Sequence, residues 1–398
     1  MILLSLVLTA PGRGQTPSAL VPSEKECEEF ARKLESELAN RQTTLLGKSL
    51  DADDLLDRSL KDLPGNDAFK EGVRAGIKKR FPDNILSSLE QGVESYKFLR
   101  VRRINDQPEI LFRLLTTGGG LNYLRFVPAR CPRRGIKLVD IHVLITGEYL
   151  SQTFRRLFMV ALAQQEKTWI ERLVGDQQDL VKHMDKAVQM ATLNRQGQQA
   201  KALEVYRTLP ATLQKEKVFL LQRMAAAGAV DEKDYAAAIE LWQKTFPNDP
   251  SLELILIDGY AMKQQYQKVV ETVDHLGETL GGDPYLDVLA GNQHYLLKDP
   301  VRATERARRA IQAEPTLAAA YDLLLTLSLD AKNFAEIVRL AEEFERTFGV
   351  SMYQSIQGEA AYAEFLKSQE GQNWSKAQRA ATLASPPADA PAPVPPSP

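Results

Sequence analysis

The sequence predicts two parts: an α+β domain, in which helices pack on a four-stranded antiparallel meander, and an all-α helical solenoid that follows it. Three observations lead to this prediction. Segments between residues 96 and 146 alternate apolar and polar side chains with the period of two that strands have. From residue 165 to 380 the strand pattern is almost absent, and a helical period replaces it. An apolar motif then recurs about every 34 residues, which is typical of stacked helix pairs.

Length and composition favour a globular protein with more than one domain. The chain has 398 residues, more than one ordinary compact core accommodates. Hydrophobic residues make up 44% and charged residues 26% of the chain, values that are typical of globular proteins. Because the formal net charge is only -2, no global field attracts nucleic acid or anionic lipid. We therefore expect no nucleic-acid partner and no membrane span in the mature chain.

The N-terminal residues 1–19 resemble a secretory signal peptide. Residues 2–10 form an apolar run of nine residues, which is too short to span a bilayer but suits the apolar region of such a peptide. No Lys or Arg precedes the run. We expect a periplasmic or secreted protein, with a cytoplasmic location as the alternative. In an oxidising compartment Cys27 and Cys131 could form a disulfide, or they could remain two free thiols.

The α+β domain is expected over residues 20–150. Helical patterns cover residues 23–48, 51–63, 67–80 and 84–94, and Asp51 or Asp53 is available as the N-cap of the second helix. Strands are expected over residues 96–104, 109–116, 121–127 and 136–146, with a turn at 117–120 and a loop at 128–135. A connecting helix over 151–179 follows. This order of elements is similar to that of cystatin-like folds and of the nuclear transport factor 2 family, in topology alone.

The repeat is carried by five residue triplets, each with the i, i+4, i+7 spacing of one helical stripe. The triplets are Ala202/Tyr206/Leu209, Ala238/Trp242/Thr245, Val269/Val273/Leu276, Ala303/Ala307/Ala310 and Ile337/Ala341/Phe344. Successive triplets are 36, 31, 34 and 34 residues apart. We therefore assign them to the second helices of four to five helix pairs over residues 180–350.

Proline and glycine positions give two further expectations for the repeats. Pro250, Pro284 and Pro315 each follow an acidic residue, which predicts that each proline opens the first helix of the next pair. Gly291 lies in the middle of a predicted helix, where a glycine costs about 1 kcal/mol relative to alanine. We therefore expect a neighbouring helix to pack closely against it.

Three segments resemble the tetratricopeptide repeat (TPR) family. Residues 233–244, which end before Asp249-Pro250, resemble the second helix of such a repeat. Leu289-Ala-Gly-Asn-Gln-His-Tyr295 with Ala303 to Ala310 resembles a whole repeat, and Tyr321 to Phe344 resembles another. The resemblance implies a superhelix whose concave groove, lined by first helices, binds an extended peptide or a partner helix. It also implies a capping helix, expected over 351–370. Residues 371–398, whose end is rich in Pro and Ala, are expected to be a disordered tail.

Candidate partner-binding residues lie on the predicted first helices. Asn292 and Tyr295 are spaced i, i+3, and Asp322 and Thr326 are spaced i, i+4, so each pair shares one face of its helix. We expect this face to point away from the second helix of the same pair. The alternative is an ordinary solvated surface.

The predicted sheet carries an excess of basic residues. Nine Arg and Lys residues fall within residues 100–137, and Arg100, Arg102 and Arg113 are the candidates for an anion site. The alternatives are single-stranded nucleic acid, which no ribonucleoprotein-type motif supports, and a solvated strand face. Nearby acidic residues such as Asp106 and Glu109 favour the solvated face.

Sequence signals for catalysis are weak. Gly47-Lys48-Ser49 lacks the upstream glycine of a phosphate-binding loop, because Gln42 stands there. The four histidines are scattered without metal-ligand spacing, and His142 is expected to be a core or edge residue of a strand. We expect no catalytic residues, no metal and no cofactor. The sequence therefore favours an exported TPR-like scaffold or adaptor, with a ligand- or anion-binding role of the basic sheet as the alternative.

Overall fold

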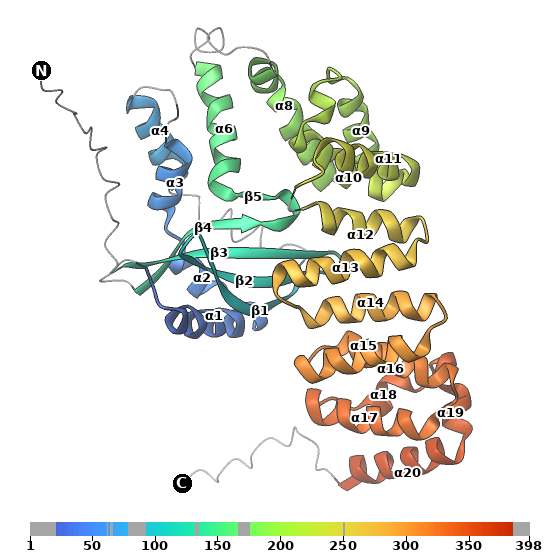
Figure 1. Cartoon of the computed structure of the whole chain (residues 1–398). Helices are drawn as coiled ribbons and strands as arrows, with labels where there is room; N and C mark the ends of the chain where they lie inside the picture. The colour runs from blue at the N-terminus through green and yellow to red at the C-terminus, as the bar shows by residue number, and fades with distance from the viewer. Residues whose placement is uncertain are drawn as a thin grey trace, which may run out of the picture. The chain divides into compact units, whose positions relative to one another are not determined.

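The computed structural model describes residues 21–61, 63, 67–78, 93–131, 135–165, 176–249 and 251–384. The expected signal peptide and the segment 385–398 lie outside these residues. The chain divides into two compact units, Met1–Ile255 and Leu256–Pro398, and each is described by itself. Unit 1 contains an antiparallel sheet with helices, followed by helix pairs, and unit 2 consists of further helices (Figure 1). This confirms the predicted fold class of an α+β domain followed by an all-α solenoid.

The sheet in unit 1 is an antiparallel meander of five strands in the order β1-β2-β3-β4-β5. The strands are β1 Val93–Ile104, β2 Gln107–Thr116, β3 Leu121–Cys131, β4 Gly135–Val143 and β5 Glu148–Tyr149. The expected fourth strand was too long, because Leu144–Thr146 forms a 3₁₀ turn and Gly147 adopts a φ of 64°. That glycine lets the chain reverse into the short fifth strand, which the sequence did not predict.

Strand β3 also differs from the prediction, because it continues through Pro128 to Cys131 instead of entering a loop. A shift in the pairing register between Val127 and Pro128 accommodates the proline, which has no N–H for the ladder. At the other end of the sheet, Val93 and Glu94 belong to β1, whereas the rest of the helix expected over 84–94 lies outside the described residues.

Four N-terminal helices accompany the sheet: α1 Glu24–Ala39, α2 Thr44–Ser49, α3 Ala52–Leu60 and α4 Asp67–Lys78. The single helix expected over 23–48 is thus two helices, because Arg41 has a φ of 54° after the C-cap Asn40. Ser23 and Glu26 form a capping box at the start of α1, and Asp51 caps α3 as expected. Ala31 and Leu34 of α1 pack on the apolar face of the sheet, in one core with Phe112 and Phe126.

Cys27 is buried in α1, Cys131 is half-buried at the end of β3, and both thiols are free. Burial raises the pKa of the Cys27 thiol to about 12, and neighbouring Glu26 and Glu24 raise it further. Cys27 is therefore an inert core residue in this structure.

The helical part of unit 1 contains α6 Leu150–Gln165, α8 Asp176–Arg195, α9 Gln199–Arg207, α10 Lys217–Val230 and α11 Glu232–Thr245. Residues 166–175, in the middle of the expected connecting helix, lie outside the described residues. The turn at Gly147 contacts the repeats directly: a Cβ built there would lie 2.6 Å from Lys217 Nζ and 2.8 Å from Asp249 Oδ1. Lys217 and Asp249, which form an ion pair of 2.5 Å within the helical part, both lie against this turn, so the α+β part and the first repeats are in contact within this unit.

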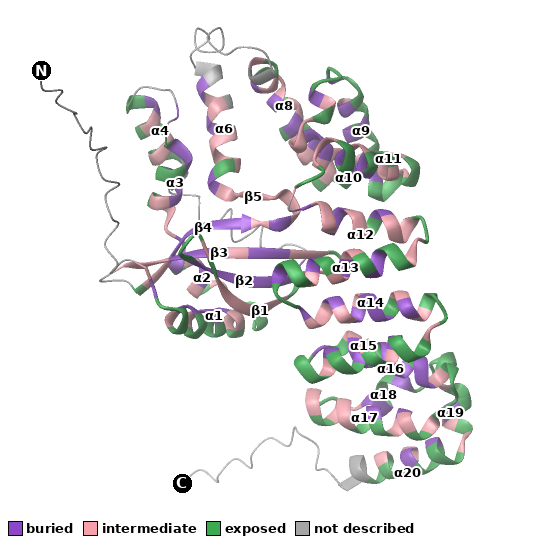
Figure 2. Ribbon diagram, viewed as in Figure 1, coloured by how far each residue is buried: buried purple, intermediate pink, exposed green. Residues whose placement is uncertain are grey.

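Helix α12, Leu252–Met262, crosses the boundary between the two units. Unit 2 continues with α13 Tyr266–Leu280, α14 Pro284–Leu296, α15 Pro300–Ala313, α16 Ala318–Asp330 and α17 Phe334–Phe348. The five triplets fall on the second helices α9, α11, α13, α15 and α17, as predicted, except that Leu209 lies two residues beyond the end of α9. Their members are buried except Thr245 and Phe344, which are half-buried, and the burial pattern along these helices is visible in Figure 2.

The proline prediction is confirmed at one of its three positions. Pro284 occupies the first turn of α14, and the carboxylate of Asp283 caps that helix by accepting a hydrogen bond from the Tyr285 N–H. For Pro315 the prediction was wrong, because α16 begins only at Ala318 and Glu314 is instead the C-cap of α15. Pro250 lies outside the described residues. Pro300, with Asp299 as its cap, has the same arrangement as Pro284.

Gly291 is closely packed, as expected from its position in a helix. A Cβ built on it would lie 2.7 Å from Leu323 Cδ2 of α16 and 3.3 Å from both Ala303 O and Arg306 Cβ of α15. The absence of a side chain therefore lets α14 approach both neighbouring helices.

The C-terminal end differs from the sequence prediction in two ways. The expected capping helix is divided into α18 Met352–Ile356, a 3₁₀ turn Ala360–Tyr362 and α19 Ala363–Lys367. The prediction of disorder from residue 371 was wrong for residues up to 384, because Gln369–Ala384 form helix α20. Trp374 explains the difference: it is 4% exposed and packs against Phe365 and Tyr353.

Candidate functional site

The first helices of unit 2 each expose one narrow stripe. On α14 the exposed positions are Asn292 and Leu296, and on α16 they are Ala318, Asp322, Thr326 and Asp330. These positions are spaced four residues apart, so they lie along one side of each helix. The other sides are packed: buried residues of α14 include Gly291 and His294, and buried residues of α16 include Tyr321 and Leu325. Three of the four predicted partner-binding residues therefore lie on these stripes; we call the two stripes the first-helix surface.

A hydrogen bond joins the two parts of this surface. Tyr295, which is half-buried beside the α14 stripe, donates its hydroxyl proton to Asp330 Oδ2 of α16 over 2.6 Å. This hydrogen bond, with a smaller effect of burial, raises the pKa of Tyr295 above its usual value. Lys298 Nζ lies 5.8 Å from the centre of the Tyr295 ring, within the range of a cation–π contact. Tyr295 therefore lies beside the first-helix surface and links its two stripes.

Two polar side chains of the first-helix surface remain available for a partner. No side-chain hydrogen bond or ion pair joins Asn292 or Asp322 to another of the residues that the structure describes. Asp322 is exposed as a residue, yet protein atoms close to its carboxyl group raise the pKa of Asp322 above its ordinary value by partial desolvation. Tyr362 lies close enough that the charges of Asp322 and Glu359 add to burial in raising its pKa.

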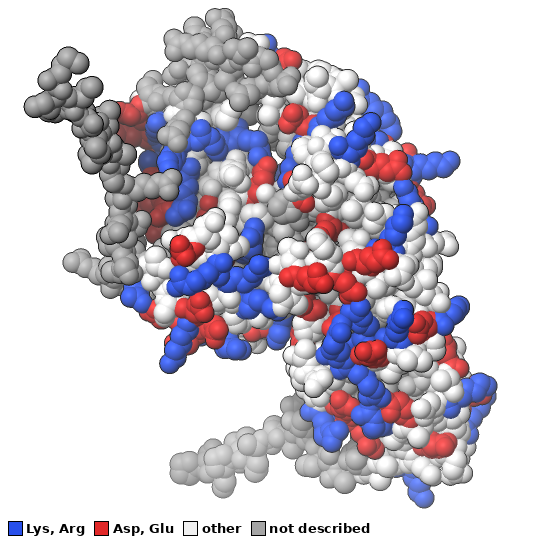
Figure 3. Space-filling model, in the orientation of Figure 1, with Lys and Arg blue, Asp and Glu red and all other residues white. Residues whose placement is uncertain are grey.

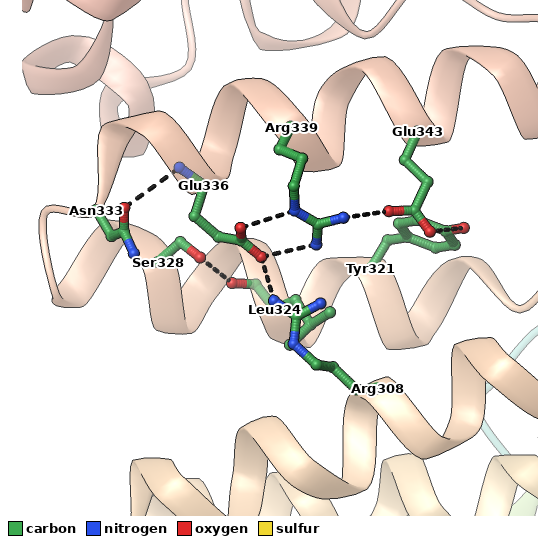
Figure 4. Close-up of polar contacts among 8 residues, drawn as sticks. All are labelled: Arg308, Tyr321, Leu324, Ser328, Asn333, Glu336, Arg339 and Glu343. Carbon is green, nitrogen blue, oxygen red and sulfur yellow. Dashed lines mark hydrogen bonds and ion pairs between the residues drawn. The ribbon is translucent and has the colours of Figure 1, made fainter.

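Several charged residues of the second helices form ion pairs with neighbouring helices or within their own helix. Arg306 of α15 contacts Asp274 of α13 at 2.7 Å and Asp287 of α14 at 3.0 Å, and so links three helices. In Figure 4, Glu336 of α17 lies between Arg308 and Arg339, and Arg339 also reaches Glu343. The hydrogen bonds from Arg339 lower the pKa of Glu336.

Acidic and basic side chains are interleaved over α13 to α17 in the view of Figure 3. This arrangement neutralises the charges of the second helices locally. The ion pairs of Arg306 also link α15 to α13 and α14.

The three arginines predicted as an anion site lie on adjacent strands, but they do not form an open basic patch. Arg100 and Arg102 of β1 are half-buried, and Arg113 of β2 is 2% exposed. Each takes part in interactions within the protein. Because Arg113 is buried, it cannot meet a ligand on an exposed sheet surface, and the alternative site loses one of its three members.

The same face of the sheet holds a buried polar cluster that the sequence did not predict. Tyr149 of β5 donates a hydrogen bond to Glu109 of β2 over 2.6 Å, and Arg125 of β3 lies 3.3 Å from the other Glu109 oxygen. His142 of β4 packs edge-on against Tyr149, with ring centres 4.9 Å apart. Burial, followed by the charge and hydrogen bond of Glu109, raises the pKa of Tyr149 to about 12.

Two further members of this cluster have shifted pKa values. Burial, followed by the positive charges of Arg125 and Lys217, lowers the pKa of His142 to about 4. Burial raises the pKa of Asp140, although Ser151 opposes this by donating two hydrogen bonds to its carboxylate. His142 is 4% exposed and is therefore a neutral core residue, as its place in a strand predicted. The short strand β5, which brings Tyr149 to the cluster, gave no sequence signal.

The described residues hold neither a grouped set of metal-ligating side chains nor a helix suited to cross a membrane. Among them, no three or more His, Cys, Asp or Glu side chains are grouped so that they could hold a metal ion. No helix within the described ranges is both long enough and apolar enough to cross a membrane.

No family model matches this sequence, and no curated protein matches it.

Proposed function

We propose that this protein is an exported TPR-like scaffold or adaptor that holds a peptide or a helix of a protein partner on the first-helix surface. The observation that carries the proposal is the contrast within unit 2. Arg306 and Arg339 on the second helices are ion-paired within the protein, whereas Asn292 and Asp322 on the first helices have no side-chain partner among the described residues. A polar side chain that becomes buried in a complex without a hydrogen bond costs free energy. The side chains of Asn292 and Asp322 therefore suit a surface on which another chain supplies the hydrogen-bond partners.

The surface combines polar and apolar contacts. Leu296 is 45% exposed at the end of the α14 stripe, and it lies one residue after Tyr295. The hydrogen bond to Asp330 restricts the Tyr295 side chain, which lowers the entropy that a partner would have to remove on binding. A partner with an apolar side chain and a hydrogen-bond donor for Asp322 fits these features.

Site-specific cross-linking tests the proposal. A photo-reactive amino acid placed at Thr326 in the full chain is expected to trap a protein partner in the native cell envelope or secreted fraction. The matched control position is Glu342, which is exposed on the second helix α17. Equal products from both positions, or products from position 342 alone, would contradict the proposed surface.

Export rests on the apolar run at residues 2–10. N-terminal sequencing of the native protein tests it: a mature chain that begins near residue 20 supports export, and an intact N-terminus argues for the cytoplasmic alternative. The role of the basic sheet in binding an anion has less support, because Arg113 is buried.

A further inference from the structure

A cavity of ≈ 570 Å³ lies at the C-terminal end of unit 2, apart from the first-helix surface. Residues of α18, α19 and α20 and of the turn after α18 line it. They are Tyr353, Gln357, Gly358, Leu366, Gln372, Ser375, Lys376 and Arg379. We call it the cap cavity.

Helix α20 presents a polar stripe to this cavity. Gln372, Ser375, Lys376 and Arg379 are spaced i, i+3, i+4, i+7, so they lie on one side of the helix. Trp374 fixes the position of that side, because its ring packs 5.7 Å from the Phe365 ring and 5.6 Å from the Tyr353 ring, measured between ring centres. Packing of the apolar side of α20 therefore holds two cationic side chains at the cavity wall.

The charge of the cap cavity is not balanced by its own walls. None of its eight lining residues is acidic. Within the described part of the chain, neither Lys376 nor Arg379 forms an ion pair with a carboxylate. Other arginines of unit 2, such as Arg306 and Arg339, do contact acidic side chains. The cavity therefore has a net positive charge and attracts an anion.

Arg379 is held in a defined position. Its Nε donates a hydrogen bond to Tyr353 Oη over 2.6 Å, and its guanidinium carbon lies 5.9 Å from the Tyr353 ring centre. A guanidinium group has five N–H bonds, so this contact leaves four donors. The Tyr353 hydroxyl accepts from Arg379 and keeps its own proton, which it can donate to a second group. Leu366 and the Tyr353 ring add apolar surface beside these donors.

We propose that the cap cavity binds an oxyanion attached to an apolar organic group, either a carboxylate or a phosphate. Arg379 binds the anion through its terminal N–H groups, as guanidinium groups bind planar or tetrahedral oxyanions in general. Lys376 adds a second positive charge, and Leu366 contacts the apolar part of the ligand. This site does not depend on the first-helix surface.

Calorimetric titration of the full chain with three probes tests the proposal. Phenylacetate and phenyl phosphate each join an oxyanion to an aromatic ring, and phenylacetamide is the neutral counterpart. We expect at least one anionic probe to bind at submillimolar to millimolar concentrations and phenylacetamide not to bind. The anion that binds with the higher affinity shows whether the cavity prefers a carboxylate or a phosphate.

Substitutions of the cationic residues that line the cap cavity test whether the probes bind there. Arg379→Gln is expected to weaken binding about tenfold or more, and Lys376→Gln about threefold, because each removes one charge from the site. Arg346→Gln is the matched control, since Arg346 is an exposed arginine of α17 outside the cavity lining, and it should leave binding unchanged. Circular dichroism checks that each variant stays folded. Absence of binding by both anions, equal binding of phenylacetamide, or unchanged binding by both folded cavity variants would overturn the proposal.

Discussion

Tyr295 of α14 donates a hydrogen bond to Asp330 of α16, and so it joins the first helices of two successive repeats on their exposed side. The buried faces of these helices already hold the repeats together through Gly291 and the alanines of α15. The Tyr295–Asp330 bond is therefore a feature of the surface, and it fixes the relative position of two side chains that a partner would contact.

A double-mutant cycle measures this bond. Tyr295→Phe, Asp330→Asn and the double variant of the full chain are expected to show a coupling energy of about 0.5 kcal/mol in urea unfolding, because the pair is open to solvent. The small value distinguishes a surface contact from a core contact. A coupling energy above about 2 kcal/mol would show that the hydrogen bond contributes to the core of unit 2.

Gly291→Ala is expected to destabilise unit 2 by about 1–3 kcal/mol. Alanine favours a helix by about 1 kcal/mol, but the added methyl group would lie 3.3 Å from the backbone oxygen of Ala303 and would displace Leu323. Gly277→Ala in α13 is the matched control, because its new methyl group would meet only Leu286 Cδ1 at an ordinary 3.6 Å. Thermal unfolding of both variants compares them, and a stabilised Gly291→Ala variant would disprove close packing at this position.

The ion pair between Lys217 and Asp249 predicts a large effect in unit 1. Lys217→Met is expected to cost about 3 kcal/mol, because it leaves the Asp249 carboxylate, which is 13% exposed, without its cation. Lys201→Met, on an exposed side chain of α9, is the control and should cost far less. Denaturant unfolding measures both, and similar losses for the two variants would contradict a structural role of this pair.

The stability that the Lys217–Asp249 ion pair contributes also depends on pH. Burial acts to raise the pKa of Asp249, but hydrogen bonds from Lys217 and Ser251 outweigh it and hold that pKa below its usual value of about 3.8. The stability that the pair contributes is therefore present above about pH 4 and is lost as the pH falls through the lowered pKa of the folded state. The Lys217→Met variant is expected to lack this part of the acid transition.

The lowered pKa of His142 predicts a second pH dependence of the stability, at higher pH than that of the Lys217–Asp249 pair. The pKa of His142 is lowered to about 4 in the folded chain from 6.5, so the unfolded chain binds the extra proton between these values. Stability is therefore complete above about pH 6.5 and falls as the pH decreases toward 4, by up to about 3 kcal/mol. Unfolding of the wild type and of His142→Gln as a function of pH measures it. An equal loss of stability in both proteins between pH 6.5 and 4.5 would contradict a buried neutral His142.

Local sequence patterns predicted the regular elements well. The strands of the meander and the five second helices were recognisable because their apolar residues keep one period over their whole length. Elements that depend on tertiary contacts were missed. Strand β5 has two residues and exists because Gly147 reverses the chain. Helix α20 looked like part of a polar tail, and it is ordered by the packing of Trp374.

The candidate site was predictable only in part. Helical spacing placed Asn292 with Tyr295, and Asp322 with Thr326, but it could not show that a hydrogen bond joins the two helices, because Asp330 lies 35 residues from Tyr295. The sequence could not show that Arg113 is buried, because strand alternation gives the face of a residue without showing whether that face is covered. The cap cavity depends on contacts between three short elements and gave no pattern in the sequence.

The affinity of the full chain for the partner trapped at position 326 tests the proposed function most directly. Thr326→Arg places a long cation on the first-helix surface, and Glu342→Arg makes a similar change on the exposed side of α17. We predict that Thr326→Arg weakens binding about tenfold or more while Glu342→Arg changes it less than about twofold. Unchanged binding by a folded Thr326→Arg variant, or a larger loss in Glu342→Arg, would contradict the assignment of partner binding to the first helices.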